Sequence, residues 1–281
     1  MKYKYYHNIL SWQLSTFQFV LGLCLVVATF FVGNNIASFL FNEMPFLQLF
    51  SLTFPFLLAL GAFISFFNNY LKIPFSQLLY ANQEQKFDKS RFIFGFITWF
   101  FIQIVIETGI YCIDPSHYSF NFRFDTAFIF LLISALIFIP FQAAFEEIIT
   151  RSYILQFIFQ QVKNPWFAMF ATALIFALLH ISNPEIGSYG KGMMLLYYFM
   201  AGTLMGLLAI LDGRMELNIG MHVSNNLYTA IVVGYGSSAF GTNTLVTITE
   251  LNIKISLLGF VIAGILLVFI CNLKYKWFKF Y

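Results

Sequence analysis

Two adjacent carboxylates interrupt an otherwise apolar stretch, FEEIITR at residues 145–151. On a helix, Glu147 and Arg151 are four residues apart and close enough to form an ion pair. Glu146 points about 100° away from Glu147 and is left without a partner on its own helix. An unpaired carboxylate of this kind has the chemistry of a general base.

Two of the four histidines also lie in apolar stretches, each with a notable residue one helical turn away. Phe176 precedes His180 by four residues and Asn226 follows His222 by four, so each pair shares one helix face. A carboxylate base, two imidazoles and an amide from three helices are the groups needed to activate water and stabilise an oxyanion.

Each feature alone also has a structural interpretation. The sequence favours a structural ion pair for Glu147 and Arg151, because pairing is how a membrane protein accommodates such charges. A lone histidine in an apolar span can simply bridge two helices by a hydrogen bond. Together with an unpaired Glu146, however, the two histidines indicate a site. Glu107, Gln142 and Asn225 are weaker candidates, for which helix contacts or interface exposure are expected.

The chain that carries these groups has the composition of an integral membrane protein. Of its 281 residues, 60% are hydrophobic and 10% are charged, which excludes an ordinary soluble domain. Apolar stretches near the roughly 20 residues needed to cross a bilayer recur along the chain. They predict a single all-α membrane domain (1–281) of about eight transmembrane helices around a polar cavity, with a motif-bearing core at about 127–235. The expected spans are 14–32, 46–67, 92–113, 127–149, 166–181, 192–211, 220–235 and 255–273.

The basic residues support this segmentation, because cytoplasmic loops are enriched in Lys and Arg. With the N-terminus inside, only Arg123, Lys191 and Lys254 of the 15 basic residues fall outside. The other twelve, Arg151 among them, fall on the cytoplasmic side, together with the C-terminus. The net charge of +3 therefore reflects topology and does not indicate nucleic-acid binding.

The three motifs, taken together, resemble the signature of the CPBP family (CAAX prenyl protease and bacteriocin-processing proteins, also called Abi) of intramembrane proteases. That signature is EExxxR, FxxxH and HxxxN, in this order on separate helices. Here the motifs are Glu146-Glu147 with Arg151, Phe176 with His180, and His222 with Asn226. The resemblance covers the region from Phe145 to Asn226, and the flanking spans match only in being hydrophobic.

This resemblance implies a membrane endopeptidase in which Glu146 is the base that activates water. The remaining catalytic groups would hold the water, polarise the scissile carbonyl or stabilise the tetrahedral intermediate: His180, His222 and Asn226. Glu147, Arg151 and Phe176 would support the site.

The resemblance leaves the cofactor open. Family members are usually labelled metalloproteases, yet this chain lacks the HExxH arrangement that places two zinc ligands and a base on one helix turn. One arrangement is a zinc ion held by Glu146, His180 and His222, and the other is a metal-free water activated by glutamate. Asn226 is a poor zinc ligand and suits oxyanion binding.

A residue count poses a geometric test for this hypothesis. It places Glu146 near the inner end of its span and His180 near the outer end of the next, on the order of 20 Å apart in depth at 1.5 Å per residue. Apolar residues continue past Arg151 to Phe159, so a longer, tilted or broken helix would place Glu146 deeper. The catalytic hypothesis requires Glu146 to lie at this greater depth, close to His180.

Two other functions use the same residues. In a transporter, Glu146, His180 and His222 would relay protons or bind an ion, and in a silent scaffold they would have no reaction to perform.

For the protease, the expected partners are the lipid bilayer and a peptide or membrane-protein substrate, with no nucleic acid. We expect a multi-pass protein of the cell membrane whose cavity opens to the cytoplasm, and the Phe-, Ile- and Asn-rich composition favours a bacterial source. The sequence does not indicate the substrate or the oligomeric state.

Overall fold

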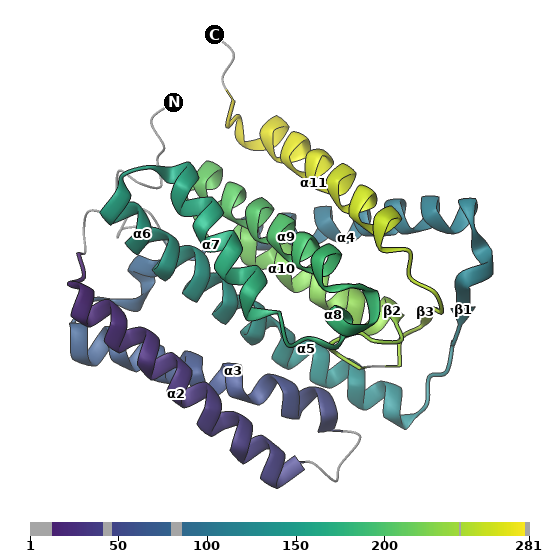
Figure 1. Cartoon of the computed structure of the whole chain (residues 1–281), viewed down its shortest axis with the longest axis horizontal. Helices are drawn as coiled ribbons and strands as arrows, with labels where there is room; N and C mark the ends of the chain where they lie inside the picture. Colours follow the sequence, from purple (N-terminus) through teal and green to yellow (C-terminus); the bar gives the residue numbers. More distant parts are fainter. Residues whose placement is uncertain (1–12, 42–46, 80–85, 242, 279–281) are drawn as a thin grey trace.

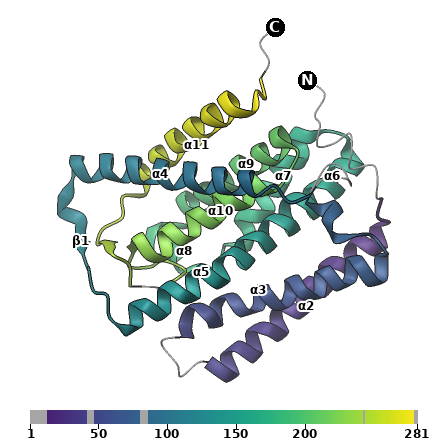
Figure 2. The same ribbon diagram turned by 180° about the vertical axis from the view of Figure 1, so that it is seen from behind.

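The computed structural model describes residues 13–41, 47–79, 86–241 and 243–278, which form an all-α bundle with one small sheet. Most helices run in a similar direction, with α10 in the middle and the sheet at one end (Figures 1 and 2). The helices are α2 (Thr16–Phe41), α3 (Gln48–Ser65), α4 (Lys89–Ile113), α5 (Thr126–Glu147), α6 (Leu155–Val162), α7 (Pro165–Leu179), α8 (Pro184–Tyr189), α9 (Lys191–Asp212), α10 (Glu216–Leu227) and α11 (Ile253–Tyr275).

Six helices in the described part of the chain are long and apolar enough to cross a membrane. They are α2, α3 with its extension to Leu71, α4, the continuous helix Thr126–Val162, α9 and α11. Large apolar side chains cover the outside of the bundle, as on Phe39 (88% exposed) and Ile265 (65%), which is the surface that lipid requires. The predicted class, an all-α polytopic membrane protein, is confirmed.

The predicted count of eight spans is not confirmed. The stretches expected at 166–181 and 220–235 form shorter helices, because α7 has 15 residues and α10 has 12. α10 continues as a π-helical segment (Tyr228–Val232) and then as a strand. Both helices are therefore shorter than the roughly 20 residues that cross the hydrocarbon core.

The helix with the two glutamates is longer than the predicted span, which ended at residue 149. α5, a π-helical segment (Ile148–Ile154) and α6 form one continuous helix that ends at Val162. The prediction that Arg151 lies on the cytoplasmic side is wrong, since its side chain is 1% exposed and buried inside the bundle. The buried carboxylate of Glu147 pairs with this cation and replaces the hydration that Arg151 would have in water.

This longer helix resolves the depth problem. Glu146 lies well inside the helix and not near its inner end, so the basis for expecting a separation from His180 no longer holds. The expected opening of the cavity to the cytoplasm was likewise based on a position of Glu146 near the inner end of its helix. Glu146 does not have that position. A wider π-helical turn is frequent at functional sites, and this one directly follows Glu147.

α10 is the central element, and nearly all of its residues are buried. It crosses α4 at two glycines, one on each helix, and each glycine lies against the backbone of the other helix. A Cβ built on Gly95 would overlap the carbonyl of Leu217 in α10, and one on Gly220 would overlap the carbonyl of Phe92 in α4. Small residues allow membrane helices to approach this closely.

The Gly202–Gly206 pair in α9 has the helix-packing role expected of a GxxxG motif. Gly202 lies against Ala173 and Gly206 against Met169, both in α7. α7 and α9 therefore pack closely on one side of the bundle, where α7 delivers His180 at its C-terminal end.

Asp and Asn residues start several helices. Asp88 accepts hydrogen bonds from the backbone N–H groups of Ser90 and Arg91 at the start of α4, and Asn164 accepts from two N–H groups at the start of α7. Such caps satisfy N–H groups that have no partner within the helix. The Ser90 hydroxyl, with these N–H groups, lowers the pKa of Asp88 below its ordinary value.

A three-stranded sheet closes the end of the bundle where α10 finishes. Its order is β1 (Tyr118–Phe120), β3 (Val246–Ile248), β2 (Val233–Tyr235), with β1 antiparallel and β2 parallel to β3. The turns α6–α7 and α9–α10 lie at the opposite end (Figure 1). That end carries Lys163 and Arg214, in agreement with the predicted charge bias, whereas Lys2, Lys4 and Lys279 lie outside the described residues.

We expect Gly95→Ala and Gly220→Ala each to lower the stability of the bundle by about 1–3 kcal/mol, because the added methyl group meets backbone that cannot rotate away. Thermal unfolding in detergent micelles measures this. Gly109→Ala on the same helix as Gly95 is the matched control, since a Cβ there meets nothing within 4 Å. Equal melting temperatures for Gly95→Ala and Gly109→Ala would contradict the close crossing of α4 and α10.

Candidate active site

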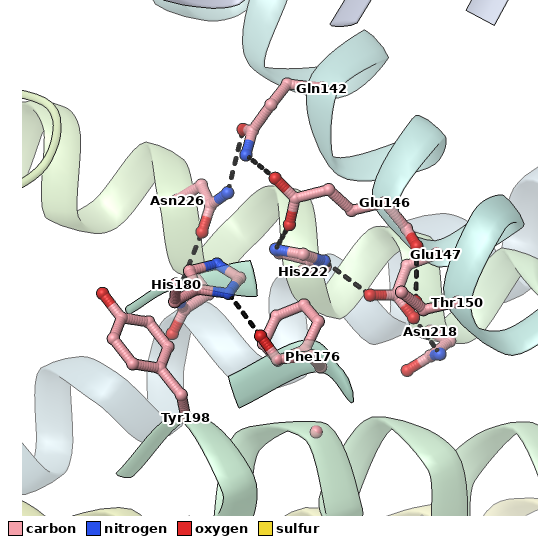
Figure 3. Close-up of polar contacts among 12 residues, drawn as sticks. Gln142, Glu146, Glu147, Thr150, Phe176, His180, Tyr198, Asn218, His222 and Asn226 are labelled. Carbon is pink, nitrogen blue, oxygen red and sulfur yellow. Dashed lines mark hydrogen bonds and ion pairs between the residues drawn. The ribbon is translucent and has the colours of Figure 1, made fainter. Parts of the chain in front are cut away.

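The structure gathers the predicted site residues in the middle of the bundle (Figure 3). Glu146 and Glu147 end α5, His180 directly follows α7, and α10 supplies His222 and Asn226. Three separate helices therefore meet at one polar centre, as the motifs predicted.

The imidazole of His222 lies between the two glutamates. Its Nδ1 is 2.7 Å from Oε1 of Glu147, and its Nε2 is 3.7 Å from Oε2 of Glu146 (Figure 3). A carboxylate accepts hydrogen bonds, so Nδ1 carries the proton and donates to Glu147. In the neutral ring Nε2 then has a free lone pair on the side of Glu146. Consecutive glutamates thus contact the two nitrogens of one ring.

Glu147 is fully buried, and three donors compensate its charge. Arg151 lies 3.0 Å from Oε1 in the predicted ion pair, Asn218 donates to Oε2 at 2.6 Å, and His222 donates as described. Burying an ion is expensive unless it is paired and hydrogen-bonded. Glu147 therefore ties α5 to α10 and is committed to holding structure.

Arg151 is likewise enclosed by partners from several elements. Its guanidinium donates to the hydroxyl of Thr150 at 2.6 Å and to the carbonyl of Gly202 in α9 at 3.4 Å. It also stacks over the ring of Phe176 at 4.4 Å, a favourable cation–π contact. The planar, many-donor guanidinium suits this task better than a lysine ammonium would.

Phe176 also orients His180. Nδ1 of His180 lies 2.7 Å from the Phe176 carbonyl oxygen, which can only accept, so Nδ1 carries the proton here as well. The imidazole lies between the rings of Phe176 (centroid distance 4.4 Å) and Tyr198 (4.3 Å). The FxxxH spacing thus supplies both an acceptor and an aromatic wall.

Glu146 differs from Glu147 in its surroundings. Its side chain is 13% exposed, and its Oε1 accepts a hydrogen bond from Nε2 of Gln142 at 2.6 Å. The prediction that Glu146 has no partner on its own helix is therefore wrong, because Gln142 lies one turn earlier on the same face. Nδ2 of Asn226 in turn donates to Oε1 of Gln142 at 3.0 Å.

Three further residues belong to this centre. Gln142 makes the expected helix contacts, with Glu146 on its own helix and with Asn226 in α10, and so joins two of the motifs. Tyr198 and Asn218 lie outside the three motifs. A hydroxyl and an amide within apolar stretches are a signal, but only the three-dimensional packing shows that they face the site. Glu107 lies apart and accepts from the Tyr118 hydroxyl at 2.5 Å, which is a contact of the expected kind.

The zinc alternative finds no ready ligand group in the part of the chain that the structure describes. Among the residues that the structure describes, no three His, Cys, Asp or Glu side chains converge closely enough to hold a metal ion. The same holds for the three predicted ligands, Glu146, His180 and His222. A zinc ion needs three or four such ligands at about 2.0–2.3 Å.

Comparisons with known proteins agree with the motifs. Residues 126–228 match the family described as type II CAAX prenyl endopeptidase Rce1-like. The chain is also similar to the uncharacterized protein YyaK of Bacillus subtilis (strain 168), with 31% identity over 185 residues, which are 65% of this chain and 60% of that protein. No solved structure matches. The matched segment contains all three motifs, so the resemblance drawn from them is confirmed for this part of the chain.

We expect Arg151→Met to lower the free energy of unfolding by about 3–5 kcal/mol, because it leaves a buried carboxylate without its cation. Adding Glu147→Gln to this variant removes the charge and should restore part of the loss. Chemical unfolding in micelles measures both, with the exposed Arg123→Met as control. If Arg151→Met were as stable as Arg123→Met, the ion pair would have no structural role.

Proposed function

We propose that this chain is an intramembrane endopeptidase of the Rce1-like type, in which Glu146 activates water to cleave a peptide bond. The match of residues 126–228 to the family supports the class of reaction. One arrangement supports the assignment of roles above all: of two adjacent glutamates, Glu147 is saturated with donors, whereas Oε2 of Glu146 faces the imidazole of His222 at 3.7 Å.

That separation is too long for a direct hydrogen bond. A water molecule in contact with both atoms would donate one hydrogen to Oε2 of Glu146 and the other to Nε2 of His222. Because the Nδ1 protons of His180 and His222 are engaged by fixed acceptors, the Nε2 atoms of the neutral rings are acceptors. They are suited to orienting water and substrate N–H groups.

The reaction then follows a balanced course. Glu146 takes a proton from the water as its oxygen bonds to the scissile carbonyl carbon, and the carbonyl electrons move to oxygen. Nδ2 of Asn226 donates one hydrogen to Gln142 and has a second one, which we assign to the oxyanion. When the C–N bond breaks, Glu146 returns the proton to the leaving amine. No step requires a metal ion.

The substrate class is a peptide or a membrane-associated protein. The chain spans about 60% of the length of its curated relative, so activity and substrate are proposed for this chain on its own residues. We place the protein in the cell membrane with both termini in the cytoplasm, which the charge distribution at the two ends of the bundle supports.

The direct test compares peptides from membranes and medium of cells that carry either the wild-type chain or Glu146→Gln at matched expression. We expect at least one new peptide terminus with the wild type and none with the variant. Glu250→Gln is the matched control, because Glu250 is 81% exposed and should leave cleavage intact. Identical profiles for wild type and Glu146→Gln would reject the protease, and flux dependent on an ion gradient would then favour a transporter.

Metal chelators provide a second test. Since the described residues contain no group of three or more His, Cys, Asp or Glu that could hold a metal ion, we expect cleavage by the purified protein to continue at an unchanged rate in the presence of EDTA or 1,10-phenanthroline. Thermolysin in the same mixture is the positive control for chelation. Loss of cleavage that returns on adding Zn²⁺ would reject the metal-free mechanism while leaving the protease assignment in place.

A further inference from the structure

A line of side-chain amides connects α4 to the proposed base. The Trp99 indole donates from Nε1 to Oδ1 of Asn225 at 3.2 Å, and Nδ2 of Asn225 donates to Oδ1 of Asn226 at 3.2 Å. Nδ2 of Asn226 donates to Oε1 of Gln142 at 3.0 Å, and Nε2 of Gln142 donates to Oε1 of Glu146 at 2.6 Å. Figure 3 shows the last part of this line, from Asn226 to Glu146.

The chemistry of its two ends sets the direction of the line. An indole N–H can only donate, so Asn225 must present its oxygen to Trp99 and its NH₂ group to Asn226. The orientations of the Asn226 and Gln142 amides follow in turn, because an amide whose oxygen accepts from one neighbour presents its NH₂ group to the next. An ionised carboxylate can only accept, so Glu146 demands the same direction. The two independent ends agree.

Burial makes this direction matter. Trp99 is 1% exposed, Gln142 8% and Asn226 7%, so bulk water cannot readily replace a lost partner. A second donor, Nε2 of Gln103, lies 3.4 Å from Oδ1 of Asn225 and favours the same orientation. In a site of low dielectric constant, hydrogen bonds are stronger and unpaired polar groups are costly.

The line has two consequences at the site. Oε1 of Glu146 is occupied by an N–H donor, so Oε2, on the side of His222, is the oxygen left to take a proton. Oδ1 of Asn226 is occupied by Asn225, so its NH₂ group is turned toward Gln142 and the site. A base and an oxyanion donor are thus oriented by one set of bonds.

We infer that Gln142 is a positioning residue for Glu146, and that Trp99 and Asn225 set the orientation of its amide through Asn226. The inference rests on the proposed function, because Glu146 is the base there. It assigns a role to an amide outside the three motifs and to an indole on a different helix. If these side chains only filled space, the direction of their hydrogen bonds would have no effect on Glu146.

Infrared difference spectroscopy of the purified protein tests this without any substrate. The carboxylate stretching band of Glu146 is identified in each background by its loss in Glu146→Gln. Gln142→Met removes the donor at nearly constant volume, so this band should shift to the frequency of a carboxylate that lacks this hydrogen bond. Trp99→Phe should shift the band in the same direction by less, since Gln103 remains.

Asn225→Asp is the sharpest variant, because residue 225 does not touch Glu146. An ionised aspartate has no hydrogen to donate, so the amide of Asn226 must turn to donate to it and present oxygen to Gln142. The amide of Gln142 must then present oxygen to Glu146. We expect a shift of the Glu146 carboxylate band at least as large as in Gln142→Met. Ser134→Ala, a buried change in α5 outside the line, should leave it unchanged.

An unchanged Glu146 carboxylate band in both Gln142→Met and Asn225→Asp would overturn the inference. With a peptide that the wild type cleaves and Glu146→Gln does not, Gln142→Met should lower kcat by about tenfold or more at unchanged KM, as expected for a misplaced base. Absence of cleavage by the wild type would reject the proposed function instead. Cleavage by Gln142→Met at the wild-type rate and with the wild-type pH profile would reject the positioning role alone.

Discussion

The burial of one carboxylate, Glu147, is the constraint on which the site depends. A charged group that is fully removed from water destabilises a protein unless it finds a cation and hydrogen-bond donors. In this bundle the donors come from its own helix (Arg151) and from α10 (His222 and Asn218). Neutralising that single charge therefore sets the rotation of α10 against α5 and places His222 beside Glu146.

Close packing makes this arrangement reachable. The crossing of α4 and α10 at Gly95 and Gly220 leaves no room for a side chain, which allows a helix of only 12 residues to lie deep among longer ones. In lipid the driving force between helices is packing and hydrogen bonding, since the tails are as apolar as the side chains. The short helix that carries two motif residues thus has protein on nearly all sides, and its polar groups need not face lipid.

The sequence predicts which residues meet at the site better than it predicts where their helices end. The types and spacings of the residues in EExxxR, FxxxH and HxxxN led to the groups that meet in the structure, because i, i+4 relations are properties of any helix. Helix ends were predicted less well. Apolar residues on both sides of Arg151 are compatible with a span that ends there or continues to Val162, and the outcome depends on a partner, Glu147, that allows the arginine to stay buried.

Gln142 shows the other limit of sequence reasoning. Its position one turn before Glu146 is visible in the sequence, but its value depends on Asn226, which lies 84 residues further along the chain. Hydropathy and periodicity describe each helix by itself and carry no information on which faces of α5 and α10 meet. A polar residue in an apolar span is therefore a sound signal that something binds it, while the identity of the partner is a tertiary property.

The two glutamates show how environment separates the roles of identical neighbours, as in enzymes whose paired carboxylates divide acid, base and electrostatic duties. Glu147 is fully buried and accepts hydrogen bonds from Arg151, Asn218 and His222. These three bonds hold α5 and α10 together. Glu146 keeps one oxygen toward His222 and is 13% exposed. Because His222 is bound to Glu147 through Nδ1, its orientation toward Glu146, the proposed base, is set by the same charge that holds the helices together. The stability of the bundle and the geometry around Glu146 therefore depend on one imidazole, and a change that loosens Glu147 must also move the groups around Glu146.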